Sequence, residues 1–157
     1  MRRKDREVTG LHEIKEIIDM NKTVCIAMID QDMPYVLPMS YGYELVNNEL
    51  ILYLHCAKEG RKIDILNINN NVCFTIFNEG TPIYAEIPCN SGYYFSSIIG
   101  NGKVEWINES EEKKKALKIM FKHQSGQDVE FHEKQADSVC VFKIVSDDFS
   151  AKKKAMK

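Results

Sequence analysis

Residues 55–62 are the segment of this chain whose residue types could best support chemistry, and they include three cationic side chains. Lys58, Arg61 and Lys62 stand at positions i, i+3 and i+4, so on a helix that begins near Ala57 or Lys58 they would share one face. The unpaired N–H groups of the first helical turn would lie beside them. Cations there oppose the helix dipole unless an anion compensates. The spacing predicts a phosphate site.

An ordinary solvated helix face explains the same cations without a ligand. Glu59 and Asp64 stand among them and would balance their charge. The position of the cations in the first two turns favours the anion site, and both interpretations stay open at this point.

The cysteines exclude a clustered metal site. The chain has five cysteines, an odd number, which are widely spaced and form no CxxC pair: Cys25, Cys56, Cys73, Cys89 and Cys140. We expect thiols within apolar runs to be inert core residues. Cys56 is different, because neighbouring cations would stabilise its thiolate, but no other feature supports a cysteine hydrolase.

Composition sets the general class of the protein. The 157 residues and formal net charge of −2 predict a single domain, residues 1–157, with no overall attraction to nucleic acid or anionic membrane. No apolar run is long enough to cross a bilayer, and the basic start of the chain leads into polar sequence rather than a signal peptide. We expect a cytoplasmic protein.

Hydrophobic periodicity predicts about six strands and three helices. Strands are expected at 23–29, 35–43, 49–55, 72–77, 93–107 and 138–145, and helices at 7–20, 58–68 and 108–124. Thr9 and the Asn108/Glu111 pair are the expected caps, and Asn47-Asn48 is a hairpin turn.

The regions between these elements carry three further predictions. Residues 78–92 form a loop or an irregular edge, and residues 151–157 form a frayed basic tail. Gly100 and Gly102 mark a bulge or a close backbone approach. Hairpin connections without regular β-α alternation predict a mainly β fold with peripheral helices, a six-stranded antiparallel barrel.

Three segments carry a family resemblance. They are Pro38-Met39-Ser40-Tyr41-Gly42-Tyr43, His55-Cys56-Ala57-Lys58-Glu59-Gly60-Arg61-Lys62 and Ser97-Ile98-Ile99-Gly100-Asn101-Gly102. Together they resemble the FMN-binding split barrel of the pyridoxamine 5'-phosphate oxidase superfamily, and within it the nitroimidazole-resistance flavoproteins. One departure is Ser96, where the resembled pattern has a basic residue, so substrate choice is open.

The resemblance implies a homodimer with FMN at the subunit interface and a small-molecule substrate. It implies an FMN-dependent oxidoreductase that reduces a nitroimidazole or a related small nitro-heterocycle. By position it assigns Lys58, Arg61 and Lys62 to the FMN phosphate, and Ser97 to the site from the partner chain. The same resemblance places Pro38, Met39, Ser40 and Tyr41 along the isoalloxazine ring.

His55 has several open roles: a flavin or substrate contact with catalytic function, a structural residue, or a haem ligand. His12, His123 and His132 match no ligand spacing, and we expect them at the surface.

Other functions remain as alternatives. The fold can carry flavin or haem without turnover. Pyridoxamine-phosphate oxidase activity is a less favoured alternative, because this chain has no C-terminal segment with the arginine and histidine residues that bind that substrate. A nucleic-acid-binding barrel would need a basic groove beside the aromatic residues at 93–95.

Overall fold

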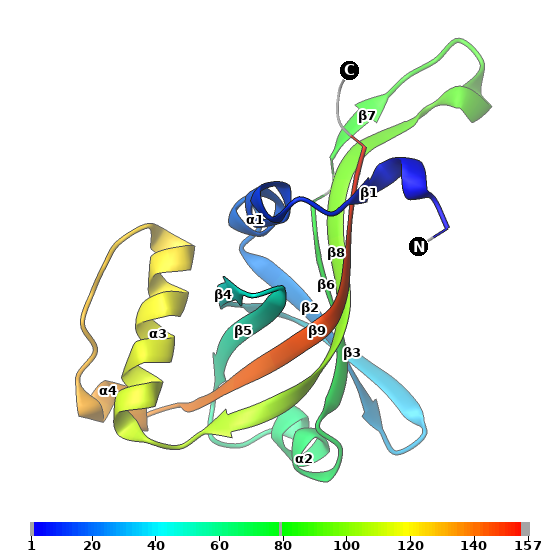
Figure 1. The fold of residues 1–157 in the computed structure, drawn as a ribbon. Coiled ribbons are helices and arrows are strands. Elements are labelled where there is room, and N and C mark those ends of the chain that lie inside the picture. The colour runs from blue at the N-terminus through cyan, green and yellow to red at the C-terminus, as the bar shows by residue number, and fades with distance from the viewer. Residues whose placement is uncertain (1, 79, 155–157) are drawn as a thin grey trace.

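One antiparallel sheet of nine strands dominates the computed structural model, which describes residues 2–78 and 80–154 (Figure 1). The strands are β1 (Glu7–Val8), β2 (Thr23–Asp30), β3 (Met33–Ser40), β4 (Gly42–Val46), β5 (Glu49–Cys56), β6 (Asn71–Phe77), β7 (Thr81–Ile83), β8 (Gly92–Ile107) and β9 (Cys140–Lys154). The α-helices are α1 (Leu11–Asp19), α2 (Arg61–Ile68), α3 (Ser110–Ser125) and α4 (Glu133–Asp137), and the short 3-10 helices are η1 (Lys4–Arg6) and η2 (Pro88–Asn90). The mainly β class with peripheral helices is confirmed, whereas the predicted count of six strands is wrong.

The strand order explains the barrel-like shape. The path runs β3-β2-β6-β8-β9-β5-β4, with β1 beside β9 and β7 beside β8. Its two outer strands are consecutive in the chain and are separated only by Tyr41: Ser40 pairs with Thr23 of β2, and Gly42 pairs with Tyr53 of β5. The predicted single strand 35–43 is therefore two strands. The chain changes partner at Tyr41, and hydrogen bonds do not close the sheet.

The inward faces of the strands form the main core. Its largest fully buried side chains include Tyr41, Phe74, Phe142, Ile26, Leu52 and Leu54. A second cluster lies on the other face of β5 and β9, under α3 and α4: Tyr53, Ile107, Ala116, Leu117, Met120, Ala136 and Val141. Alternate residues of β5 thus pack into two different cores, which explains why the sequence of this strand is a continuous apolar run.

Strands β8 and β9 lie side by side along most of their length and bend together (Figure 1). The register shifts between Asn101 and Lys103, which confirms the predicted irregularity. A Cβ on Gly100 would lie 2.6 Å from the ring of Phe74, and one on Gly102 would lie 2.7 Å from Ile144. Both glycines therefore permit a close approach of neighbouring groups.

Both N-terminal caps were predicted incorrectly. Helix α1 begins at Leu11 after Gly10, without a side-chain cap, because the preceding Glu7–Val8 pairs with β9. Helix α3 begins at Ser110, and its N-cap Glu109 has no side-chain cap bond. Helix α4 was not predicted. No helix in the described ranges is long and apolar enough to cross a membrane.

In contrast to the predicted frayed tail, residues 151–154 belong to strand β9. Strand β9 continues to Lys154 because Lys152 pairs with Ser97, and its ammonium group lies 5.2 Å from the centre of the Phe95 ring. Lys153 forms an ion pair with Glu16 of α1. Residues 155–157 lie outside the described residues. Within residues 78–92, the predicted loop or irregular edge contains the short edge strand β7.

Candidate functional site

The junction between β5 and α2 holds most of the predicted phosphate site. Helix α2 begins at Arg61, after Gly60 with φ 132° and ψ 162°, a backbone conformation that is essentially restricted to glycine. The first intrahelical bond is donated by Ile63 to the carbonyl oxygen of Gly60. The N–H groups of Arg61 and Lys62 precede that bond and are available to an anion.

Lys58 does not share a helical face with the other two cations. It lies in the turn between β5 and α2, three residues before the helix begins, and is exposed. The predicted start of the helix near Lys58 is wrong, because Gly60 has a non-helical backbone conformation and the helix begins only after it. Only Arg61 and Lys62 stand at the positive end of the helix dipole.

Arg61 already has protein partners that the sequence did not reveal. Its Nε and Nη2 atoms each lie 2.8 Å from Oδ2 of Asp30, at the end of β2. Its guanidinium lies 4.5 Å from the centre of the Tyr35 ring on β3. These contacts hold Arg61 against the β2–β3 hairpin, so the orientation of its side chain is set before any ligand binds.

His55 is the next titratable side chain along β5. Partial burial lowers its pKa below the usual range, and the positive charge of Lys62 adds to this effect. Burial also raises the pKa of the neighbouring Cys56 thiol, which Lys62 partly opposes. At neutral pH the site therefore presents a neutral imidazole and a protonated thiol next to a cation.

A cavity of about 360 Å³ opens beside His55, between the sheet and helices α3 and α4. Its lining is mostly apolar with a few polar groups: Ser40, His55, Leu117, Met120, Phe121, Gln124, Phe131, Gln135, Ser138 and Val139. Ser40 and His55 are the two predicted site residues that the fold brings together here. The α4 side of the cavity was missed, because a five-residue helix leaves little periodic signal.

The remaining predicted residues fall into two groups. Met39 packs against the core, and Tyr41 is fully buried, with its hydroxyl donating to the carbonyl oxygens of Ile18 and Asn21. Neither of these side chains lines the cavity beside His55. Pro38 and Ser97 lie on the outer face of the sheet instead.

That outer face is apolar and uncovered. It consists of alternate residues of β3, β2, β6 and β8, and about half of each of four large side chains is exposed: Ile29 (49%), Val36 (58%), Phe77 (51%) and Ile99 (53%). The register places Pro38, Ser40 and Ser97 on the same face. Because β8 is the third strand from β3, Ser97 lies roughly 14 Å or more from Ser40 and does not line the cavity of its own chain.

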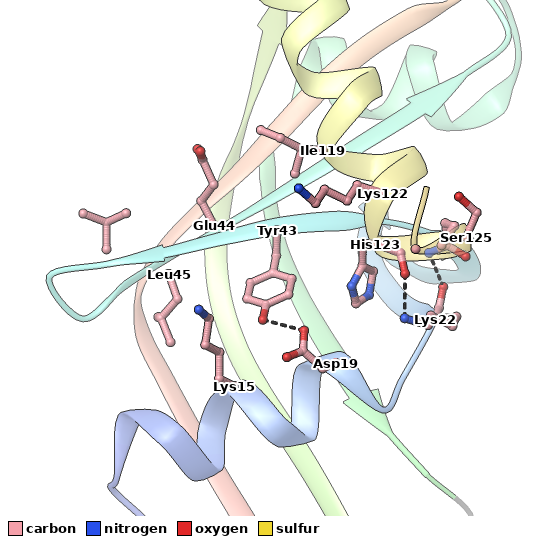
Figure 2. Close-up of a pocket in the computed structure, with 13 residues that line it drawn as sticks. Lys15, Asp19, Lys22, Tyr43, Glu44, Leu45, Ile119, Lys122, His123 and Ser125 are labelled. Carbon is pink, nitrogen blue, oxygen red and sulfur yellow. Dashed lines mark hydrogen bonds between the residues drawn. The ribbon is translucent and has the colours of Figure 1, made fainter. Parts of the chain in front are cut away.

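A larger recess, about 750 Å³, lies elsewhere, between α1, β4 and the C-terminal end of α3 (Figure 2). None of the predicted site residues lines it. Figure 2 shows Tyr43 pointing toward Asp19, and the two side chains form a hydrogen bond of 2.7 Å. His123 is half-buried between Tyr41 and Tyr43, with Nε2 3.0 Å from the carbonyl oxygen of Asn21, so the prediction that it lies at the surface is wrong.

Comparisons with known proteins agree with this geometry. A family model described as pyridoxamine 5'-phosphate oxidase matches residues 11–153. A proposed 5-nitroimidazole antibiotic resistance protein from Bacteroides thetaiotaomicron is 33% identical with a TM-score of 0.79, over 93% of this chain and 85% of that one. No curated protein matches the sequence.

Two more distant structures share the fold. The flavocytochrome Anf3 from Azotobacter vinelandii has a TM-score of 0.81 at 18% identity, over 99% of this chain and 72% of that one. The FAD and haem binding protein from Mycobacterium smegmatis has a TM-score of 0.79 at 15% identity, over 96% and 74%. The extent of the family match and the 33% identical relative together show that this chain belongs to the pyridoxamine 5'-phosphate oxidase family.

Proposed function

We propose that this protein is an FMN-dependent oxidoreductase of the cytoplasm that reduces a small nitro-heterocycle such as a nitroimidazole. The observation that supports this most is the β5–α2 junction. There Arg61 and Lys62 present cations and N–H groups at a helix N-terminus, next to His55 and an apolar cavity. The donors suit a phosphate, and the cavity suits a small planar ring.

The residues divide the work between binding and chemistry. Arg61 and Lys62 would hold the FMN phosphate, and Lys58 would add charge from the preceding turn. Bound FMN would supply two-electron redox chemistry. His55, as a neutral imidazole, would donate or accept one hydrogen bond at the polar end of the acceptor. Phe121 would exclude water from the ring of the acceptor together with the other apolar residues of the cavity.

The homodimer is supported by the outer sheet face. Exposed apolar patches of this kind mark interaction surfaces, and a second copy would cover Ile29, Val36, Phe77 and Ile99. Ser97 lies on this face but not at its own cavity. A second subunit would therefore bring its own Ser97 toward the flavin, with FMN at the interface.

A binding protein without turnover is the second candidate. Two structures with the same fold are named for haem as well as flavin, although at their low identity they share only the fold. The visible spectrum separates the candidates: flavin absorbs at about 450 nm, and haem gives a sharper band at about 400 nm.

The first test is a titration of the purified protein with FMN, followed by flavin fluorescence, with riboflavin in parallel. We expect saturable binding of one FMN per chain and much weaker binding of riboflavin, which lacks the phosphate. Equal affinities would contradict the phosphate site. Binding of FMN without reduction of nitro compounds would favour the second candidate.

A further inference from the structure

Two cysteines stand directly opposite each other on neighbouring strands. Cys56 is the last residue of β5, Cys140 is the first residue of β9, and they are register partners. Side chains of directly opposed residues in an antiparallel pair lie on the same face. Their Cα atoms are about 4.5–5.5 Å apart, within the range of about 4.4–6.8 Å in which disulfides form. The backbone thus holds both thiols at disulfide spacing.

This juxtaposition is specific to the two residues. The other cysteines face different residues: Cys25 pairs with Thr75 of β6, and Cys73 pairs with Ala27 of β2. Cys89 belongs to η2, outside the main path of the sheet. All five thiols are free in the structure.

We propose that Cys56 and Cys140 form an oxidisable dithiol, which peroxide converts reversibly into a cross-strand disulfide. Cys140 is partly exposed and Cys56 is buried, at 7% exposure. A small oxidant therefore reaches Cys140 first. Burial raises the pKa of the Cys56 thiol, which lowers its thiolate fraction and disfavours its direct attack on peroxide.

The chemistry balances with hydrogen peroxide as the oxidant. The Cys140 thiolate attacks one peroxide oxygen, the O–O bond breaks, and a sulfenic acid forms while the leaving hydroxide takes up a proton to become water. The sulfur of Cys56 then attacks the sulfur of Cys140, and the sulfenic hydroxyl leaves as a second water. Two thiols lose two electrons and two protons, and one peroxide is reduced to two waters.

The position of the pair connects two parts of the molecule. Cys56 directly precedes the turn that leads to Arg61, and Cys140 directly follows Val139, which lines the cavity. A cross-link here would restrain both. Because Cys140 is partly exposed, a disulfide here is accessible to reductants, which makes the modification reversible.

The test uses the full chain, reduced and then treated with a small molar excess of hydrogen peroxide. Peptide mapping under non-reducing conditions, after alkylation of free thiols, is expected to give a linked peptide with Cys56 and Cys140, two hydrogens lighter than the separate peptides. The linkage closes a long loop, so the melting temperature is expected to rise by several degrees. Dithiothreitol is expected to reverse both changes.

Variants provide the control. Cys56→Ser and Cys140→Ser are each expected to abolish the linked peptide, whereas Cys73→Ser, at an exposed cysteine outside the pair, retains it. Peptide mapping of the unaltered chain still shows whether the Cys56–Cys140 disulfide forms, even if a serine variant fails to fold. The proposal is overturned if peroxide consumes Cys73 and Cys89 while Cys56 and Cys140 remain fully open to alkylation. None of these readouts depends on flavin binding.

Discussion

Arg61 has the most defined geometry of the proposed phosphate ligands. Its Nε and Nη2 groups contact Asp30 and its flat face lies on Tyr35, whereas no hydrogen bond within the described residues involves Nη1. An anion at the helix N-terminus can use these remaining donors without displacing Asp30. The ion pair is solvent-exposed and contributes little to stability by itself.

Replacement of Arg61 should therefore affect the ligand more than the fold. Arg61→Ala is expected to weaken FMN binding by about 1.5–3 kcal/mol, the scale of a charge-assisted hydrogen bond. The matched control is Arg3→Ala, which removes another exposed arginine–aspartate pair, with Asp5. Fluorescence titration measures both. Unchanged FMN affinity in the Arg61 variant would rule out the phosphate assignment.

His55 should titrate at a lower pH than an ordinary histidine. Because its pKa is lowered in the folded state, the unfolded chain binds more protons as the pH falls below the usual value of about 6.5. The His55 contribution to stability is thus complete above that pH and is lost as the pH falls through the folded pKa. Lys62→Gln is expected to raise the His55 pKa only in part, because burial is the larger cause.

NMR titration of the histidine ring protons measures this shift. Lys58→Gln is the control, because Lys58 is not among the charges that act on His55. Equal shifts in the two variants would show that Lys62 has no particular effect on His55.

At the scale of elements, two turns depend on unusual backbone conformations. Asn47 and Asn48 both have positive φ, 50° and 65°, which confirms the predicted hairpin turn between β4 and β5. Gly60 positions the start of α2 in the same local way. Each turn directs the strand or helix that follows it.

Gly60→Ala tests the second turn. No atom lies within 4 Å of the added Cβ, so the effect comes from the backbone alone, and we expect a loss of about 1–3 kcal/mol in the free energy of unfolding. Gly10→Ala is the control, because Gly10 has φ −73° and ordinary space for a Cβ. Urea unfolding compares the two. An equal effect of both substitutions would argue against strain at Gly60.

For the molecule as a whole, the uncovered sheet face is the proposed dimer interface. Val36 lies on this face in β3, the strand at one end of the sheet path, and is 58% exposed. Val36→Lys would place a charge in the proposed interface, and we expect the dissociation constant of the dimer to rise by at least about tenfold. FMN binding should weaken with it, because in the proposed dimer the second chain completes the site.

Analytical ultracentrifugation measures the dissociation constant. The control is Leu11→Lys, which changes an apolar residue of similar exposure (50%) at the start of α1, beside the β4–β5 turn. A monomeric unaltered chain, or a dimer that tolerates Val36→Lys, would contradict the interface.

Features that depend on short stretches of chain could be predicted from the amino-acid sequence alone. Alternating and continuous apolar runs predicted the main strands, Asn47-Asn48 predicted a turn, and the transition after His55 predicted the strand–helix junction. These signals are local, because backbone preference and hydrophobic period act over a few residues. The motifs in residues 38–43, 55–62 and 97–102 were sufficient for the family.

Features that join distant segments became visible only in the folded chain. The pairing of Arg61 with Asp30, the exchange of strand partners at Tyr41, the cavity beside His55 and the opposition of Cys56 and Cys140 each need two or more elements in contact. No local periodicity encodes such contacts, because they depend on sheet register and on the packing of helices against it.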